Sequence, residues 1–318
     1  MNRPGTRGGD GVLYGLAAYG IWGVFPLYFV HLARSSPVEI VLHRVLWSLL
    51  ICLGLVAILR RGRSLLEAMR SVRTVVPLTI AALFLAGNWG IYVFAVTSGQ
   101  VVQASLGYFI NPLVTVLLGV VVLRERLRPA QWTAVAIGAV AVTVLTLDYG
   151  RLPWIALSLA FSFAIYGLVK NRVGVSHSAL TSLTTETLVL APVAAAVLIG
   201  IEARGAGHFS DNPPWQGLLL ASTGIATVGP LLLFAAAARR VPLSTVGLMQ
   251  FLTPVLQLMC GVLVLGERVP PSRWIGFTLV WLALAVLSLD SLRSARRRVR
   301  AAAPVDGAPL TEVASSLR

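Results

Sequence analysis

The sequence predicts an all-α integral membrane protein with ten transmembrane helices, arranged as two inverted repeats of five helices each. Three observations lead to this prediction. Apolar residues make up 57% of the 318 residues, whereas charged residues make up only 12%, about half of their usual share in soluble domains. The apolar residues form runs long enough to cross a bilayer, and the second half of the chain repeats part of the first. So little polar surface excludes a soluble globular protein.

Ten apolar runs divide the chain, and each is close to the length of about 20 residues that a helix needs to cross the hydrocarbon core. Polar residues 1–10 precede the first run, which is too long for a cleaved signal peptide and lacks its small-residue exit. Short polar segments separate the runs, so consecutive helices are expected to cross in opposite directions. The predicted helices cover residues 11–33, 38–59, 75–97, 102–123, 130–147, 152–170, 179–200, 215–238, 243–265 and 272–290.

The distribution of basic residues predicts that both termini are cytoplasmic. The net charge of +14 results from 26 Lys and Arg against 12 Asp and Glu. With the amino terminus inside, the cytoplasmic segments hold 20 of these basic residues and the outer segments hold 5, while Arg44 lies within a span. Cytoplasmic loops are enriched in Lys and Arg in this way. A strong positive charge can also indicate nucleic-acid binding, but such proteins carry it on a polar fold, so no nucleic-acid partner is expected.

Residues 291–318 are expected to form a cytoplasmic tail that is first basic and then disordered, because its last part is rich in Ala, Pro and Ser. The segment Arg293–Arg300 (RSARRRVR) can bind the anionic headgroups of the lipid bilayer. Its charge is explained equally well by a role in orienting the last helix.

The second half of the chain repeats the first at a fixed offset of 142 residues. FINPLVTVLLGVVVLRERLRPAQW, from Phe109, aligns without gaps to FLTPVLQLMCGVLVLGERVPPSRW, from Phe251, and 15 of the 40 positions 109–148 are identical. Each copy contains five spans, an odd number, so the second copy must be inverted. Inverted repeats occur in secondary transporters, where the substrate binds at the repeat interface near mid-bilayer; a duplicated membrane scaffold is the alternative. The two repeats are predicted to cover residues 11–148 and 152–290.

The fourth and ninth spans carry polar residues at equivalent positions near the middle of the bilayer. On the fourth span they recur at spacings of three or four, which places them on one helical face. Polar groups inside hydrocarbon are costly and usually face a bundle interior or a wet cavity, so these residues are predicted to line a substrate pathway. Interhelical hydrogen bonds are the alternative role. The residues are Tyr108, Asn111 and Thr115 on the fourth span and Gln250, Thr253 and Gln257 on the ninth.

A proline follows the central polar residue of each of these spans, Pro112 after Asn111 and Pro254 after Thr253. Each proline lacks an N–H group and frees the carbonyl four residues earlier. Both positions are therefore predicted to be helix breaks. Freed carbonyls at membrane depth need a partner helix, water or a ligand, which favours the same pathway.

The second and seventh predicted spans contain Glu39, His43, Arg44 and Glu186, and charge inside a span is costly. Glu39 and His43 share one face of the second span, and Arg44 lies roughly 10 Å from its outer boundary. Arg44 aligns with Glu186 of the seventh span, at a similar depth from the inner boundary, so no direct salt bridge between the two is expected. Arg44 is predicted to attract an anionic substrate group, and Glu186, Glu39 or His43 to carry a coupling proton. A structural ion pair or a snorkelling arginine is the alternative.

Aromatic and amide side chains in other spans extend the predicted pathway. Trp22 and Tyr166 occupy equivalent places in the first and sixth spans, and Asn88 forms a polar face with Tyr92 on the third. Lys170, the only lysine, lies one helical turn from Tyr166 at the cytoplasmic side. Aromatic walls suit a cavity for an organic solute, and ordinary helix packing produces the same pattern.

The sequence contains no motif of a cofactor, metal or nucleotide site. There is no Walker GxxxxGK[ST], no HExxH, no CxxC and no GxSxG. No cofactor, no metal and no enzymatic activity are therefore expected. Cys52 and Cys260 both fall within spans and are expected to pack as small apolar residues, without a disulfide.

Four segments from the first four spans carry a family resemblance: LAAYGIWGVFPLYF, EIVLHRVLWS, GNWGIYVFAV and ASLGYFINPLV. In this order they resemble the RarD branch of the EamA family, within the drug/metabolite transporter superfamily. The resemblance covers about residues 11–290. It implies ten helices in two inverted EamA repeats, a central cavity lined mainly by spans 1–4 and 6–9, and peripheral spans 5 and 10.

We therefore predict a secondary transporter of the bacterial inner membrane that moves a small organic metabolite or drug by alternating access. In one version transport is coupled to protons. An uncoupled facilitator or exchanger of the same fold is the alternative, followed by a non-transporting scaffold or receptor. The spans themselves predict no particular oligomeric state.

Overall fold

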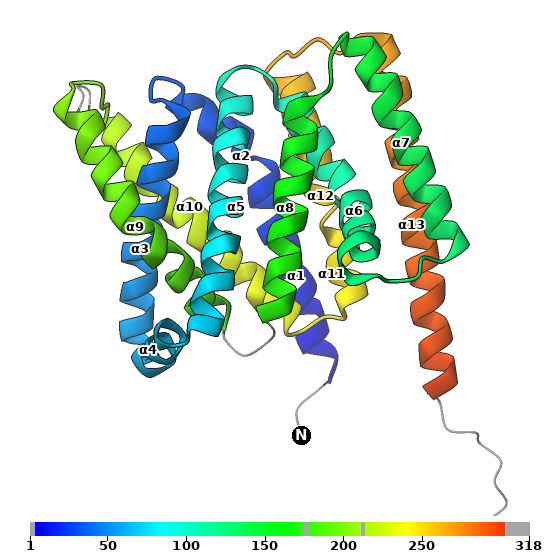
Figure 1. The fold of residues 1–318 in the computed structure, drawn as a ribbon, viewed down its shortest axis with the longest axis horizontal. Coiled ribbons are helices and arrows are strands. Elements are labelled where there is room, and N and C mark those ends of the chain that lie inside the picture. Colours follow the sequence, from blue (N-terminus) through cyan, green and yellow to red (C-terminus); the bar gives the residue numbers. More distant parts are fainter. Residues whose placement is uncertain (1–3, 174–177, 211–213, 303–318) are drawn as a thin grey trace, which may run out of the picture.

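The computed structural model describes residues 4–173, 178–210 and 214–302, and these ranges contain helices and no strand (Figure 1). The first half of the chain forms α1 (Pro4–Gly23), α2 (Phe25–Phe29), the short 3₁₀ helix η1 (Val30–Leu32), α3 (Pro37–Ile58), α4 (Gly62–Arg70), α5 (Val72–Thr97), α6 (Val101–Leu123) and α7 (Pro129–Tyr149). The second half forms α8 (Trp154–Val173), α9 (Ala179–Ala203), α10 (Trp215–Ala238), α11 (Leu243–Met249), α12 (Leu252–Met259), the π-helix η3 (Cys260–Val264) and α13 (Pro271–Ala302).

Nine helices of the described ranges are long and apolar enough to cross a membrane, and a bent pair of helices makes a tenth if it counts as one span. The pair consists of Gly9–Gly23 and Phe25–Leu32, and the helix axis bends by 42° between them. Pro26 explains the bend, because it stands in the first turn of α2 and has no N–H group to continue the hydrogen bonds of α1. The predicted first span is thus a broken helix.

The segment after α3 contains a short helix, α4, that the predicted spans do not include. Its nine residues are too few to cross a bilayer. Ala68 is buried, and the Ser64 hydroxyl lies 3.4 Å from the Thr181 hydroxyl of α9. α4 therefore packs against the end of the bundle as an additional element.

The regular hydrogen bonding of the ninth span is interrupted at Gln250 and Phe251, just before Pro254, although both residues keep helical dihedrals and Thr245–Val264 remains one membrane-length helix. Cys260–Val264 then forms a π-helix, an element that is frequent at functional sites. α6 runs through Pro112 without interruption, which corrects the predicted break there. Phe109 and Leu113 are buried on either side of the proline, and packing of this kind lets a membrane helix tolerate one missing hydrogen bond.

The two ends of the described chain are more helical than the sequence predicts. α1 begins at Pro4, within the predicted polar segment 1–10, and α13 continues to Ala302, past the predicted end of the last span. The basic segment after the last span is thus a continuation of α13. Of the tail predicted to be disordered, residues 301–318, the first two residues belong to α13, which corrects the prediction there, and residues 303–318 lie outside the described residues.

The two halves of the chain pack unequally. α1 and α8, the first helices of the two repeats, run in opposite directions (Figure 1). α6 packs along α8 more extensively than its counterpart α12 packs along α1. Likewise, α3 packs along α10 more extensively than its counterpart α9 packs along α5. One set of interfaces between the repeats is therefore closed more tightly than the equivalent set.

α7 and α13, the last helices of the two repeats, lie together at one edge of the bundle (Figure 1). At one end of this pair, Asp148 accepts a hydrogen bond from Arg273 Nε at 2.7 Å and another from the Ser272 hydroxyl. At the other end, Arg128 and Asp290 form an ion pair of 2.7 Å. Asp148 and Asp290 are equivalent in the repeat, so each copy supplies one carboxylate to the other.

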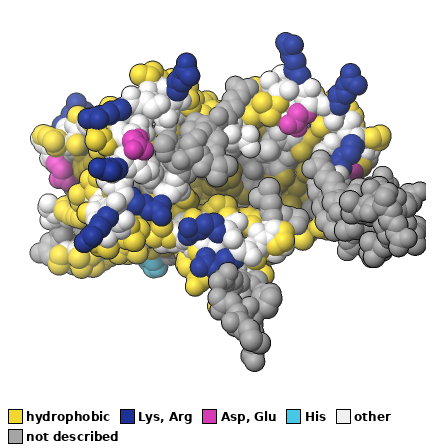
Figure 2. Space-filling model, turned by 90° about the horizontal axis from the view of Figure 1, so that it is seen from below, with side chains coloured by type: hydrophobic (Ala, Val, Ile, Leu, Met, Phe, Trp, Pro, Cys, Tyr) yellow, Lys and Arg dark blue, Asp and Glu magenta, His cyan; other side chains and the backbone are white. Residues whose placement is uncertain are grey.

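The face that contains the inner ends of the predicted spans carries separate groups of Lys and Arg with few acidic side chains between them (Figure 2). The residues of this face include Arg60, Arg61 and Arg63 before and within α4 and Arg239 and Arg240 after α10. This is the arrangement expected of a cytoplasmic face.

α6 approaches α8 closely at Gly107. A Cβ atom at this position would lie 2.7 Å from the Ala156 carbonyl oxygen and 2.9 Å from the Cβ of Leu159. We expect Gly107→Ala to lower the free energy of unfolding by about 1–3 kcal/mol, because overpacking forces the two helices apart. Thermal unfolding of the purified protein measures this change. Gly87→Ala, where nothing lies within 4 Å of the added Cβ, is the control, and an equal loss in both variants would contradict the explanation.

Candidate functional site

Arg44 lies inside the bundle and is the centre of the candidate site. Ser36 caps α3 by accepting a hydrogen bond from the Glu39 N–H at 3.1 Å, and the helix then carries Arg44 inward, where only 4% of the residue is exposed. Arg44 Nε donates to Thr227 Oγ1 of α10 at 2.7 Å. The Thr227 hydroxyl donates its own proton to the Thr223 carbonyl, so it is held as an acceptor for the arginine.

Aromatic rings surround the guanidinium group. Arg44 Cζ lies 4.0 Å from the ring centroid of Trp89, 5.6 Å from that of Phe29 and 5.8 Å from that of Phe25. Among the described residues, no carboxylate forms a salt bridge with Arg44, and its two terminal nitrogens donate to no side chain or carbonyl. A buried charge without a partner is costly, so these nitrogens are available to an anion.

Tyrosine and amide groups complete the polar surroundings of the guanidinium. Tyr28 and Tyr92 pack on Phe29, with 5.1 and 5.9 Å between ring centroids, and Tyr108 packs on Tyr92 at 5.9 Å. The Tyr108 hydroxyl donates to Asn88 Oδ1 at 3.2 Å, and Gln257 Nε2 donates to the Tyr92 hydroxyl at 3.4 Å. Gln257 Oε1 is buried without a partner in the described structure. Helices from both repeats thus contribute to one polar cluster.

Three residues of the predicted pathway, Asn88, Tyr108 and Gln257, belong to this cluster, and the backbone of a fourth, Trp22, accepts a hydrogen bond from Gln257 at 3.2 Å. The remaining polar residues of the fourth and ninth spans lie elsewhere. Asn111 donates to a carbonyl of α8 at 2.9 Å, and Thr253 donates to a carbonyl of α1 at 2.8 Å. The exposed residues are Thr115, which bonds to its own helix, and Gln250, at the break between α11 and α12.

Lys170 and Glu186 form an ion pair on the inner side of the bundle. Lys170 Nζ lies 2.5 Å from Glu186 Oε1 and 5.7 Å from the ring centroid of Tyr166. Glu186 is buried, with 1% of its surface exposed, and its Oε2 has no hydrogen-bond partner in the described structure. One oxygen of this carboxylate is therefore paired, while the other can take up a proton. The sequence placed Lys170 beside Tyr166 but did not indicate its pairing with Glu186.

Hydrogen bonds between the two halves of the chain gather at the outer ends of the predicted spans. The Tyr28 hydroxyl donates to the Leu219 carbonyl at 2.7 Å and lies 2.7 Å from the Ser222 hydroxyl. Gln216 Nε2 donates to the Ser35 hydroxyl at 3.2 Å. These contacts hold α2 and the start of α3 against α10, so they close the bundle on this side.

Glu267 closes the same side through α6. Its carboxylate accepts hydrogen bonds from the N–H groups of Val101 at 2.5 Å and Val102 at 2.9 Å, at the first turn of the helix. The N–H groups of a first turn have no partner within the helix and carry partial positive charge. In the sequence, Glu267 stood out only as the repeat equivalent of Glu125. Its role as the cap of a helix from the other repeat is visible in the structure alone.

We expect Glu267→Gln to loosen this outer closure by about 1–2 kcal/mol, because a neutral amide accepts weaker hydrogen bonds than a carboxylate. Native Cys260 is a probe of the opening, since it is buried and its neighbour Gly261 packs against Val101 and Val102. In a Cys52→Ala background, alkylation of Cys260 should become about 5- to 30-fold faster. Glu125→Gln is the matched control, and an unchanged rate in Glu267→Gln would contradict the proposed closure.

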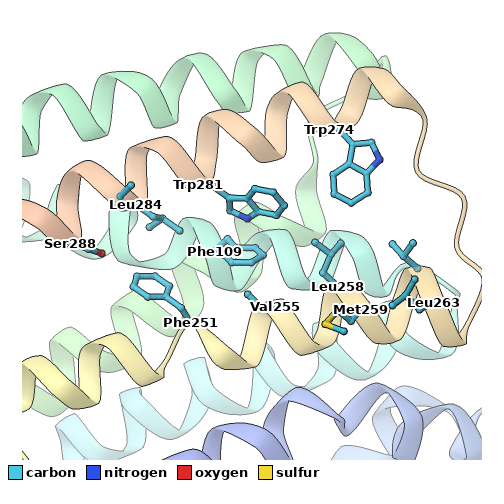
Figure 3. A pocket seen from close by; sticks show the side chains of 12 residues that line it. Phe109, Phe251, Val255, Leu258, Met259, Leu263, Trp274, Trp281, Leu284 and Ser288 are labelled. Carbon is cyan, nitrogen blue, oxygen red and sulfur yellow. The ribbon is translucent and has the colours of Figure 1, made fainter.

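A cavity of about 660 Å³ lies between α6, α12 and α13 (Figure 3) and shares no residue with the Arg44 cluster. Phe109 and Phe251, which are repeat equivalents, line it together with Trp274 and Trp281, and Ser288 supplies a hydroxyl. Binding sites for polar solutes need precisely placed polar groups. Apart from this hydroxyl and the indole N–H groups of the two tryptophans, the groove is apolar and has no charged group to orient such a solute, so the candidate site remains at Arg44.

The residues around Arg44 that the sequence did not predict include Phe25 and Phe29 of α2, Trp89 of α5 and Thr227 of α10. Trp89 follows Asn88 directly, so its position in the middle of an apolar span was a usable signal. Thr227 lies 183 residues from Arg44, and no spacing or motif joins the two. Only the packing of α10 against α3 brings them together.

Comparison with known proteins gives consistent matches along the chain. The EamA-like transporter family matches residues 10–147 and 152–289. Protein RarD of Streptomyces exfoliatus is 49% identical over 298 residues, which covers 92% of this chain and 94% of that protein. Protein RarD of Escherichia coli K12 is 41% identical, with 93% and 99% covered, and an uncharacterized transporter of Pseudomonas aeruginosa is 41% identical, with 90% and 96% covered. One solved crystal structure, with a TM-score of 0.57 and 20% identity, covers 88% of this chain and 97% of its own and shows the fold alone.

Proposed function

Since this chain belongs to the EamA-like transporter family, we propose that it is a secondary transporter that moves a small organic solute across the bacterial inner membrane by alternating access. Its helices cross the membrane ten times, the two repeats are inverted relative to each other, and both termini are cytoplasmic. The opposite directions of α1 and α8 and the basic groups on one face support this arrangement (Figures 1 and 2). The solute site lies between the repeats, around Arg44.

The solute carries an anionic group, such as a carboxylate, beside a flat apolar part. The observation that carries this assignment is the buried guanidinium of Arg44, which has unused terminal nitrogens and lies 4.0 Å from the ring centroid of Trp89. A guanidinium binds a carboxylate through two parallel N–H donors. The surrounding rings of Phe25, Phe29 and Tyr108 offer apolar faces to the rest of the solute.

Alternating access is supported by the unequal packing of equivalent interfaces. The outer contacts of Tyr28, Gln216 and Glu267 hold the two repeats together, so this conformation is closed on the outer side. The repeat equivalents of the closed interfaces, α1 with α12 and α5 with α9, pack less extensively. Opening to the outside exchanges the roles of the two sets, as inverted repeats permit.

Glu186 is the group that couples transport to a proton. Its unpartnered Oε2 accepts the proton, and protonation weakens the ion pair with Lys170. The released Lys170 then loosens the contact between α8 and α9 on the inner side. Proton binding at this pair and solute binding at Arg44 therefore act on opposite sides of the same bundle.

An uncoupled facilitator or exchanger of the same fold is the second candidate. The chemistry that favours it is the pairing of Glu186 itself, because a carboxylate held at 2.5 Å by Lys170 can serve as a permanent structural ion pair. In that version solute movement follows only the solute gradients and is independent of a pH gradient.

The substrate assignment is tested by thermal unfolding of the purified protein with panels of aromatic carboxylates, aromatic amines and neutral aromatic compounds of matched size. Carboxylates are expected to raise Tm, since a ligand that binds the folded state stabilises it. Stabilising compounds are then measured for flux in proteoliposomes. Stabilisation by amines, with no effect of carboxylates, would contradict the role of Arg44.

A further inference from the structure

A second group of ionisable residues lies at the outer end of α3. Glu39 and His43 of α3 and Glu202 of α9 each place one potential ligand atom so that all three atoms lie within 4.8 Å of one another. Glu39 and His43 are buried, with 0% and 4% of their surfaces exposed, whereas Glu202 is exposed. Two carboxylates and an imidazole thus converge on one point that can be reached from solvent.

His43 directs an unpartnered nitrogen into the protein. Its Nδ1 accepts a hydrogen bond from Trp47 Nε1 at 3.3 Å, and its ring stacks on Phe209 at 4.8 Å between centroids. Its Nε2 is buried and has no hydrogen-bond partner in the described structure. An unsatisfied buried polar atom has an energetic cost, and an additional ligand would remove that cost.

The segment after α9 lies against the carboxylates of both Glu39 and Glu202. The His208 N–H donates to Glu39 Oε1 at 2.6 Å, and His208 Nδ1 lies 3.0 Å from Glu39 Oε2. Outer partners of this kind fix the orientation of metal-ligating carboxylates. A Cβ atom at Gly207 would collide with the Glu202 carboxylate, so the absence of a side chain there makes room for this group.

We propose that Glu39, His43 and Glu202 bind a divalent transition-metal ion of the Zn²⁺ class, with His208 positioning the Glu39 carboxylate. An imidazole ligand favours Zn²⁺ and related ions over Mg²⁺ and Ca²⁺, which prefer oxygen ligands alone. Three protein ligands leave a fourth position for water. Binding at Nε2 moves the His43 proton to Nδ1, which then no longer accepts the hydrogen bond of Trp47.

The site joins the two repeats, because Glu39 and His43 belong to the first and Glu202 to the second. It lies on the side that Tyr28, Gln216 and Glu267 close. A bound ion adds coordination bonds between α3 and the end of α9, so it stabilises the outer-closed conformation. A metal ion bound to the cluster therefore opposes opening of the protein to the outer side.

The proposal is tested by titrating the purified full-length protein with Zn²⁺. At about 100 times its Kd, Zn²⁺ should raise Tm by about 5 °C, while Mg²⁺ at the same concentration should not. The indole of Trp47 should change its fluorescence during the titration, since it loses its acceptor. An equal effect of Mg²⁺ would overturn the proposal, because it would indicate charge neutralisation without nitrogen coordination.

The ligands are tested with Glu202→Gln and His43→Gln, and His31→Gln is the matched control for a histidine on the same side of the protein. Each ligand variant should bind Zn²⁺ at least about 10-fold more weakly, and the control should bind as the original protein does. Glu202 is exposed, so Glu202→Gln remains a valid test if His43→Gln does not fold. Unchanged Zn²⁺ affinity in Glu202→Gln would overturn the assignment. These readouts do not depend on the transported solute.

Discussion

Replacement of Arg44 by Gln is expected to abolish measurable flux of an anionic solute and to weaken its binding about 10- to 150-fold. The estimate follows from the loss of charge-assisted hydrogen bonds worth about 1.5–3 kcal/mol. No carboxylate among the described residues pairs with Arg44, so its removal leaves no opposite charge without a partner. The Tm of Arg44→Gln should therefore be unchanged or higher, as happens when function maintains a costly buried group.

Two further substitutions separate what the charge, the planar shape and the orientation of Arg44 each contribute to solute binding. Arg44→Lys keeps the positive charge but loses the planar fork of donors and the stacking on Trp89, so it should recover only part of the affinity. Thr227→Val removes the acceptor that orients Arg44 Nε. It should lower the affinity for the solute by less than either substitution of Arg44 does. Arg34→Gln, at an exposed outer arginine, is the control. Flux in Arg44→Gln equal to that of the original protein would sink the assignment.

The second large effect is expected at Glu186. In proteoliposomes with an imposed pH gradient, Glu186→Gln should lose solute accumulation, so that the ratio of internal to external solute stays at about 1, while exchange of labelled for unlabelled solute continues. The amide has the size of the carboxylate but neither accepts a proton nor pairs with Lys170 as an anion. Accumulation and exchange are measured in the same vesicles.

A control for this experiment addresses the Lys170 amine, which loses its partner in Glu186→Gln. Since 28% of this side chain is exposed, the lysine can extend to the surface. The double variant Glu186→Gln with Lys170→Gln restores neutrality and should show the same loss of coupling. Full dependence on the pH gradient in both variants would remove Glu186 from the mechanism, whereas accumulation that is independent of the pH gradient in the original protein would favour the uncoupled exchanger.

Much of the fold could be predicted because a membrane span has a simple sequence signature, an apolar run of fixed length. α4 escaped this criterion because an amphipathic helix of nine residues buries only one face and resembles a polar loop in composition. The two prolines looked alike in sequence, yet α6 is continuous at Pro112, while the regular hydrogen bonding is interrupted between α11 and α12. The difference depends on the packing around each proline, which the local sequence does not contain.

The candidate site was only partly predictable for a related reason. A polar residue inside a span has the same sequence pattern whether it binds solute or joins two helices. Asn111 and Thr253 donate to carbonyls of neighbouring helices, as the alternative role predicted for them requires. Arg44 was found because a charge in a span is rare, but its partners lie on α2, α5 and α10, and no periodicity links those segments.

The ion pairs at both ends of α7 and α13 have a mechanical consequence. They oppose both sliding and separation of these two helices, one from each repeat, so this edge resembles the pin of a hinge. If the repeats rock as rigid bodies about that pin, each atom moves in proportion to its distance from it. α3 and α9 lie at the opposite edge of the bundle (Figure 1), where the lever arm is longest. Glu39, His43 and Glu202 therefore occupy the place where a single bound ion would have the greatest leverage over the motion.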